Sequence, residues 1–214
     1  MNFATRFFLG VSALLASAAL SAADDVATKA LPAPQTTGGK PLMQALKERR
    51  SIRDFKPDAL TERQMSDMLW AAFGMNRPEI DHHTAPSAQN SQDVDIYVAG
   101  ADGLYLYEPK PHALKKVSNE DVRSLTSGQP FAKVVPVQLI FVSDHAKLAK
   151  AAPEMRDLYS GVDTGAIVQN VYLYCASEGL ATVVHELERA PLAKAMNLRA
   201  EQHIVVAQAV GWPK

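Results

Sequence analysis

The stretch DTGAIVQNVYLYCASEGLATVVHE, residues 163–186, joins an apolar-striped segment, a glycine and a β-branched segment. The apolar side chains of its first part recur at the spacing of one helix face: Ile167, Val168, Val171, Tyr172 and Cys175. Pro153 is typical of a helix start and Gly179 of a helix end, so we predict a helix from Pro153 to Glu178 and a strand over 180–184. The broad stripe predicts that this helix is central and mostly buried.

Further helices are predicted where apolar residues recur at the same spacing. The segment 42–50 has this pattern, and a capping box at Thr61–Gln64 begins a helix that ends at Gly74. Two shorter helices are expected over Asn119–Thr126 and Pro191–Met196.

Strands are predicted where the apolar period changes to two. VDIYVAGADGLYLYEP, residues 94–109, alternates on both sides of Asp102-Gly103, which predicts a β-hairpin. The apolar runs 137–143 and 203–211 are typical of buried strands. Because helices and strands mix without strict βαβ alternation, the predicted class is α+β, with a mixed or antiparallel central sheet flanked by helices.

The first residues have the composition of a secretory signal peptide. Arg6 precedes the apolar stretch 7–20, and Ser21-Ala22-Ala23 offers small residues to a signal peptidase. We predict a signal peptide over 1–23 with cleavage after Ala23, a flexible leader over 24–40 and a folded domain over 41–214. The mature protein would be periplasmic or secreted, without a stable membrane anchor; a retained anchor is the alternative.

The composition is that of an ordinary globular domain, with 47% hydrophobic and 21% charged residues and a net charge of −1. This balance gives no indication of a nucleic-acid partner. The single Cys175 cannot form an internal disulfide, and its apolar setting favours a buried structural thiol. No metal site is predicted, because His82-His83 and the HELE stretch at His185 lack the spacing of metal ligands.

Positive charge is concentrated in RRSIRDF, residues 49–55, which we call the arginine segment. In an extended chain Arg49, Ser51 and Arg53 would point to one side and Arg50 to the other. Two guanidinium groups and a hydroxyl that converge match a phosphate monoester, through charge-assisted and bidentate hydrogen bonds. The alternative is a solvated cationic face.

Four stretches, in this order, resemble the FMN-dependent nitroreductase family: the arginine segment, TAPSAQNSQDVDIYV (84–98), the opening stretch 163–186, and VGWPK (210–214). The resemblance extends over roughly Pro41 to Lys214. GMNRPEIDHHTAPSA, residues 74–88, is similar to a subgroup of short members related to the SagB-type dehydrogenases. The fold implied is nitroreductase-like, with the long central helix at a homodimer interface.

The resemblance implies a set of FMN-binding residues. Arg49 and Ser51 would bind the phosphate and ribityl chain, and Arg53 would lie near N1 and the C2 carbonyl of the flavin. Arg50 is a weaker candidate for the FMN site, with a solvated arginine as the alternative. The loop contributed by the opposite subunit would supply Pro86, Ser87 and Asn90. The backbone near flavin N5 would come from Val184, His185 and Glu186. Lys214 would stand where many family members have a basic pair that faces the phosphate.

The function implied is that of an exported FMN-dependent oxidoreductase with small-molecule substrates. Hydride transfer through flavin N5 would follow a ping-pong scheme, from NAD(P)H or another donor to nitroaromatic or quinone-like acceptors. No residue is a certain catalytic group, although His185 is a candidate proton donor. The alternatives are an oxidase or dehydrogenase of an exported substrate that uses dioxygen, a flavin-binding protein without turnover, and an interaction protein without cofactor.

Overall fold

The computed structural model describes residues 27–214, so the predicted signal peptide and its cleavage site lie outside the described residues. A seven-stranded sheet in the order β1-β6-β5-β4-β7-β9-β8 forms its centre, and every neighbouring pair is antiparallel. The strands are β1 (Thr28–Ala30), β4 (Val94–Gly100), β5 (Gly103–Glu108), β6 (Ala113–Ser118), β7 (Val137–Asp144), β8 (Ala181–His185) and β9 (Gln202–Gly211). The prediction of an α+β class is confirmed, in its antiparallel form.

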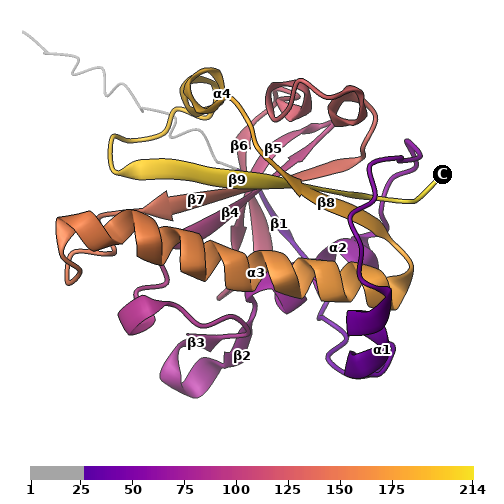
Figure 1. The fold of residues 1–214 in the computed structure, drawn as a ribbon, viewed down its shortest axis with the longest axis horizontal. Helices are drawn as coiled ribbons and strands as arrows, with labels where there is room; N and C mark the ends of the chain where they lie inside the picture. The colour runs from indigo at the N-terminus through magenta and orange to yellow at the C-terminus, as the bar shows by residue number, and fades with distance from the viewer. Residues whose placement is uncertain (1–26) are drawn as a thin grey trace, which may run out of the picture.

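Helices cover the two faces of this sheet unequally (Figure 1). The long α3 (Arg156–Glu178) crosses one face together with α2 (Glu62–Phe73), and α1 (Leu42–Glu48) lies beside the C-terminal end of α3. On the opposite face lie α4 (Arg189–Ala195) and the 3₁₀ turns of residues 123–133. The largest cluster of buried side chains fills the space between the sheet and α2 and α3. Among the described residues no helix is both long and apolar enough to cross a membrane.

The strongest periodic segments form the elements that the sequence predicts. Thr61 caps α2 through a capping box with Gln64, and Met68 and Leu69 on its apolar stripe are fully buried. In α3, Ile167 and Cys175 are fully buried, and Gly179 ends the helix in a left-handed conformation with φ of 72°. The hairpin at Asp102-Gly103 joins β4 to β5.

The predicted helix over Asn119–Thr126 is wrong, because only a single 3₁₀ turn forms there, Arg123–Leu125. Local side chains bind the backbone amides instead: Ser118 Oγ accepts the Glu120 N–H and Asp121 Oδ1 accepts the Arg123 N–H, each at 3.0 Å. Such side chain–backbone bonds compete with helix formation. The preceding residues form β6, a strand with two lysines that the sequence reasoning missed.

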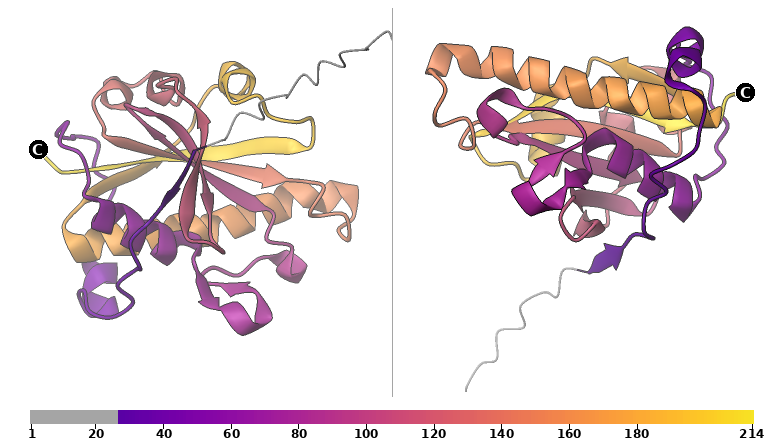
Figure 2. Two further views of the ribbon diagram at one scale, coloured as in Figure 1. Left: turned by 180° about the vertical axis from the view of Figure 1, so that it is seen from behind. Right: turned by 90° about the horizontal axis from the view of Figure 1, so that it is seen from below.

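Residues 27–40, which we call the N-terminal strap, belong to the segment predicted to be a flexible leader. Here they run along the domain, from β1 past α2 to α1 (Figure 2). β1 pairs with β6, the Leu31 N–H donates to His112 O, and Pro32 O accepts a hydrogen bond from Ser66 Oγ. These bonds to the domain give the strap a defined path. A second, two-stranded sheet of β2 (Met75–Arg77) and β3 (His82–His83) follows α2.

Candidate functional site

The arginine segment lies along the free edge of the sheet. Helix α1 ends at Glu48, and Arg49 leaves it with φ of −55° and ψ of 125°. Because β8 is the last strand of the sheet, its outer edge can accept the chain, and the Ile52 N–H donates to Thr182 O at 3.0 Å. Phe55 then forms a bridge with Pro213. The segment is therefore held between α1, β8 and the C-terminal residues.

A pocket of about 480 Å³ opens beside the first residues of this segment. Four cationic side chains and one carboxylate lie around it: Lys40, Lys47, Arg49, Arg50 and Glu48. The last turn of α3 and Pro213 complete the wall. Arg50 therefore lies at the same pocket as Arg49, and not on the opposite side as an ideal strand predicts. The reason is that Arg49, with φ of −55° and ψ of 125°, is close to a polyproline II conformation, in which side chains do not alternate between two sides as in a strand.

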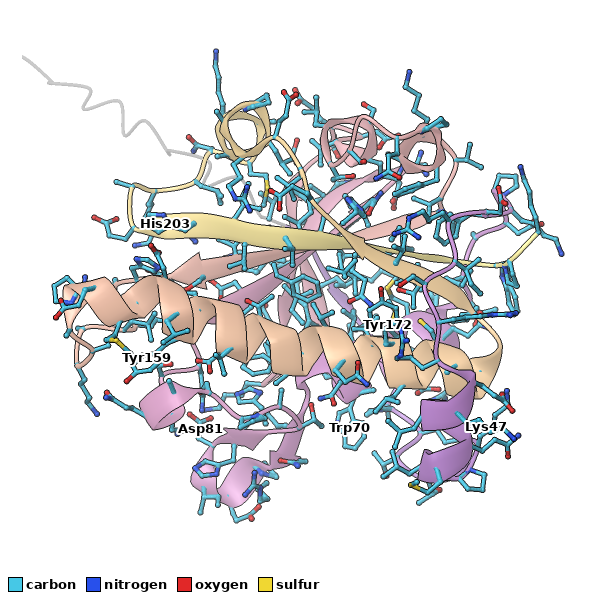
Figure 3. All side chains as sticks on the ribbon, in the orientation of Figure 1. Lys47, Trp70, Asp81, Tyr159, Tyr172 and His203 are labelled. Atoms are coloured by element: carbon cyan, nitrogen blue, oxygen red, sulfur yellow. The ribbon has the colours of Figure 1, made fainter. Side chains whose placement is uncertain are left out.

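Tyr172, which the sequence reasoning placed only in the core stripe of α3, connects the parts of the site. Its hydroxyl accepts the Val184 N–H at 2.9 Å and lies 2.9 Å from Ser51 Oγ. The Arg49 guanidinium carbon lies 5.1 Å from the centre of the Tyr172 ring, a cation–π contact. Figure 3 shows Tyr172 in the part of α3 that lies toward α1, the helix that carries Lys47. Arg49, Ser51 and Val184 thus converge on one buried phenol.

His185 is 7% exposed, and its ring packs edge-on against Phe131. Its Nε2 lies 3.0 Å from Gln138 Oε1. Burial lowers the pKa of His185 and the nearby charge of Arg53 lowers it further, whereas the hydrogen bond with Glu186 O raises it, so the net shift favours the neutral imidazole. The adjacent Glu186 carboxylate forms an ion pair with Arg189. Of the three predicted residues of this stretch, Val184 therefore has its amide bound to Tyr172, and His185 and Glu186 have partners of their own.

Two parts of the predicted site do not line the cationic pocket. The loop with Pro86, Ser87 and Asn90 is attached to the N-terminal half of α3, where both Asp163 carboxylate oxygens accept the Ala88 N–H. Asp163 precedes Tyr172 by nine residues, a separation of about 13 Å along the helix. Lys214 is exposed and does not line the pocket; its backbone N–H donates to Asp54 O at 3.3 Å. One chain thus brings the arginine segment, β8 and the C-terminus together, without that loop.

The cationic pocket fits a phosphate group. Among residues 27–214, the guanidinium groups of Arg49, Arg50 and Arg53 make no hydrogen bond or ion pair with a protein group. Arg49 and Arg50 line the pocket, whereas Ser51 and Arg53 do not. Guanidinium groups that lack a carboxylate partner are suitable donors for a phosphate monoester. The sequence reasoning missed Lys40 and Lys47, because spacing along the chain does not reveal which lysines a fold gathers.

Comparison with known proteins places this chain in a family. The family model described as "Nitroreductase family" matches residues 46–212. A protein of Methanocaldococcus jannaschii named as a nitroreductase is 31% identical over 152 residues, which cover 66% of this chain and 76% of that protein.

Solved structures agree with this match. The crystal structure of a protein of Ralstonia eutropha JMP134, also named as a nitroreductase, is 39% identical with a TM-score of 0.84, over 87% of this chain and 90% of that one. A Desulfovibrio desulfuricans protein, solved in complex with FMN, shares the fold at 23% identity and a TM-score of 0.59, over 82% and 88% of the two chains. The chain belongs to the nitroreductase family, a family of oxidoreductases.

Proposed function

We propose that this nitroreductase-family oxidoreductase is an exported, FMN-dependent homodimer that acts on small molecules by a ping-pong scheme. The observation that carries the cofactor assignment is the pocket at the start of the arginine segment, with four cations around it and two guanidinium groups that have no anionic partner. The FMN bound by the D. desulfuricans protein supports the same assignment through the shared fold. Membership of the subgroup related to the SagB-type dehydrogenases is part of the proposal and rests on the stretch 74–88.

Each part of the site has a role in this proposal. Arg49 and Arg50 bind the phosphate, and Ser51 contributes its hydroxyl to the neighbouring ribityl chain. Arg53 places a fixed positive charge near the pyrimidine end of the ring, where it stabilises developing negative charge. When bound, FMN supplies the chemistry of accepting and passing on a hydride equivalent. The β8 end, Val184 to Glu186, contributes backbone to the wall of the ring site.

Two copies of the chain are proposed to complete each site. The loop with Pro86, Ser87 and Asn90 is bonded to the N-terminal half of α3, and the arginine segment is bonded to its C-terminal half. If two copies paired with their α3 helices antiparallel, the loop of one copy would therefore lie near the arginine segment of the other. The outer face of α3 suits such a contact, because Leu158 and Val162 are 56% and 61% exposed. Exposed apolar side chains in such a patch are typical of an interface.

The first experiment is an absorbance spectrum of the purified mature protein after incubation with FMN and removal of the excess. We expect one retained FMN per chain, and weaker retention in Arg49→Ala, because a charge-assisted contact is worth about 1.5–3 kcal/mol. A protein that stays colourless would contradict the cofactor assignment.

The direction of electron flow is tested by adding NADH or NADPH to the loaded protein without oxygen. Bleaching of the flavin spectrum, followed by recovery with a nitroaromatic or quinone, is expected for a reductase. A spectrum unchanged by both nucleotides would instead favour an oxidase or dehydrogenase of an exported substrate, which the export signal also favours, because a secreted protein meets little NAD(P)H. A flavin that no biological reductant reduces would mean a binding protein without turnover.

A further inference from the structure

The N-terminal strap ends at the cationic pocket, although it lies outside the region that the family model matches, residues 46–212. Its last residue, Lys40, lines the pocket beside Arg49 and Arg50. We propose that Lys40 is a phosphate-binding residue of the cofactor site, delivered by the strap, and that it supplies the charge that Lys214 does not bring to the pocket. The inference rests on the proposed FMN site and adds a residue to it.

The position of Lys40 is fixed by several contacts. Its N–H donates to Ser177 Oγ at 2.8 Å, and its ammonium donates to Glu48 Oε2 at 2.7 Å and to Ala176 O at 3.0 Å. The preceding Gly39 has φ of 74°, and a Cβ there would lie 2.5 Å from Ser177 Oγ. The strap therefore passes so close to the end of α3 that a glycine is required just before the lysine.

Lys40 offsets two negative features at this pocket. Without Lys40, the Glu48 carboxylate at the pocket would repel an incoming phosphate. The hydrogen bond from Lys40, followed by that from Gln44, lowers the pKa of Glu48. The C-terminal end of the 23-residue α3 also points here, and the carbonyl groups of a last turn disfavour anions. The Lys40 ammonium binds both Glu48 and Ala176 O, so it offsets the charge of the carboxylate and the partial charge of the helix end.

Lys40 also retains a donor for a ligand. A lysine ammonium has three N–H donors, of which the domain uses two, on Glu48 and Ala176. Its side chain is 34% exposed, so the third N–H can reach a phosphate oxygen in the pocket. Lys214, in contrast, is exposed and outside the pocket wall.

The test compares FMN with riboflavin, which lacks the phosphate, in fluorescence titrations of the full mature chain. Lys40→Met keeps the aliphatic stem and removes the charge. We expect its Kd for FMN to rise about tenfold, while its Kd for riboflavin stays within about twofold of wild type. Lys40→Arg should restore most of the FMN affinity. Lys29→Met is the matched control, because Lys29 lies in the same strap but forms an exposed ion pair with Glu62.

An unchanged FMN affinity in Lys40→Met would overturn the inference while leaving the proposed function intact. An equal loss of affinity for FMN and for riboflavin in Lys40→Met would also overturn the inference, because it would mean that Lys40 only fixes the position of the strap. If the wild-type protein binds neither flavin, the proposed function fails. The inference about Lys40 is then tested by the effect of inorganic phosphate on the melting temperature. A rise in melting temperature with phosphate in wild type, lost in Lys40→Met, would support Lys40 as a phosphate ligand, and no rise in wild type would refute it.

Discussion

Tyr172 joins an arginine, a serine and a backbone amide around one side chain that is 6% exposed. Replacing Tyr172 by Phe keeps the ring and its contact with Arg49 but leaves the Val184 N–H without its acceptor. A buried donor without a partner costs about 1–3 kcal/mol. We expect the free energy of unfolding of Tyr172→Phe, measured by urea denaturation, to fall by this amount.

Tyr174→Phe is the control for this prediction. The Tyr174 hydroxyl lies on the same helix and donates to Gln64 O across a longer 3.3 Å. Its removal should cost less than about 1 kcal/mol, because this acceptor can be satisfied elsewhere. An equal loss of unfolding free energy in the two variants would mean that the bond between the Tyr172 hydroxyl and the Val184 N–H gives no special stabilisation.

Asp163 and Asp93 place two carboxyl groups together in the interior, 4% and 0% exposed, and neither forms an ion pair with a described residue. Asp163 binds the Ala88 N–H at 2.9 and 3.0 Å, and Asp93 accepts hydrogen bonds from Ser91 and Ser143. Burial and the neighbouring Asp93 raise the pKa of Asp163 to about 7. The loop that carries Ala88 is therefore attached to α3 by a carboxyl group whose pKa in the folded state lies well above its ordinary value of 3.8.

This arrangement predicts a pH dependence of stability. The unfolded chain loses the Asp163 proton near its ordinary pKa of 3.8, whereas the folded chain keeps it up to about pH 7. The folded state therefore binds more protons in this window, and the free energy of unfolding should fall as pH rises from 4 to 7, then level off. Asp163→Asn, which keeps an acceptor for Ala88, should flatten this slope in denaturation curves. Asp157→Asn, with its side chain 94% exposed on the same helix, should leave the slope as in wild type.

At the scale of elements, two helices end at glycines for different reasons. Gly179 after α3 has φ of 72°, and a Cβ there would meet no atom within 4 Å. Gly74 after α2 has an ordinary φ of −70°, but a Cβ would lie 2.3 Å from Trp70 Cδ1 and 2.7 Å from Trp70 Cα. The first position needs a left-handed conformation, and the second needs space beside a tryptophan.

The two positions should therefore respond differently to asparagine, which tolerates the left-handed conformation. Gly179→Asn should lower the free energy of unfolding by less than about 1 kcal/mol. Gly74→Asn should cost about 1–3 kcal/mol by overpacking and should shift the tryptophan emission, because Trp70 must move. Thermal denaturation followed by fluorescence measures both effects, and a larger loss at Gly179 would contradict this assignment.

At the scale of the molecule, the proposed dimer should depend on the outer face of α3. Gly161 lies between the exposed Leu158 and Val162, Gly165 follows one turn later, and a Cβ at either glycine would meet nothing within 4 Å. Val162→Glu would place a charge in the middle of the contact, so we expect a monomer in analytical ultracentrifugation, with reduced FMN retention. Val117→Glu is the control: Val117 is 42% exposed and lies on β6, near the edge of the sheet opposite β8. This variant should remain a dimer. A dimeric Val162→Glu protein would exclude this face.

The sequence by itself determined the elements whose periodicity is strong and local. Helix α3 with its Gly179 end, the capped α2, the hairpin at Asp102-Gly103 and the buried β7 follow from side chains that are near neighbours along the chain. The cationic arginine segment was also visible in the sequence, and its match to a phosphate stays a prediction that rests on residue type and short spacing. It missed the short strands β1, β2, β3 and β6. Of these, β1 and β6 lie at one edge of the large sheet and pair with each other, and β2 pairs with β3.

Only the tertiary structure decided which distant residues meet. Tyr172 and Lys40 reach the arginine segment because α3, β8 and the N-terminal strap pack at one edge of the sheet, and no local pattern encodes that packing. Arg50 lies at the same pocket as Arg49 because the backbone at Arg49 does not have the two-residue repeat of a strand. Burial raises the pKa of Asp163, and Asp93, seventy positions earlier in the chain, raises it further. Pairing, burial and charge proximity are properties of the folded chain, so they appear only when the fold is known.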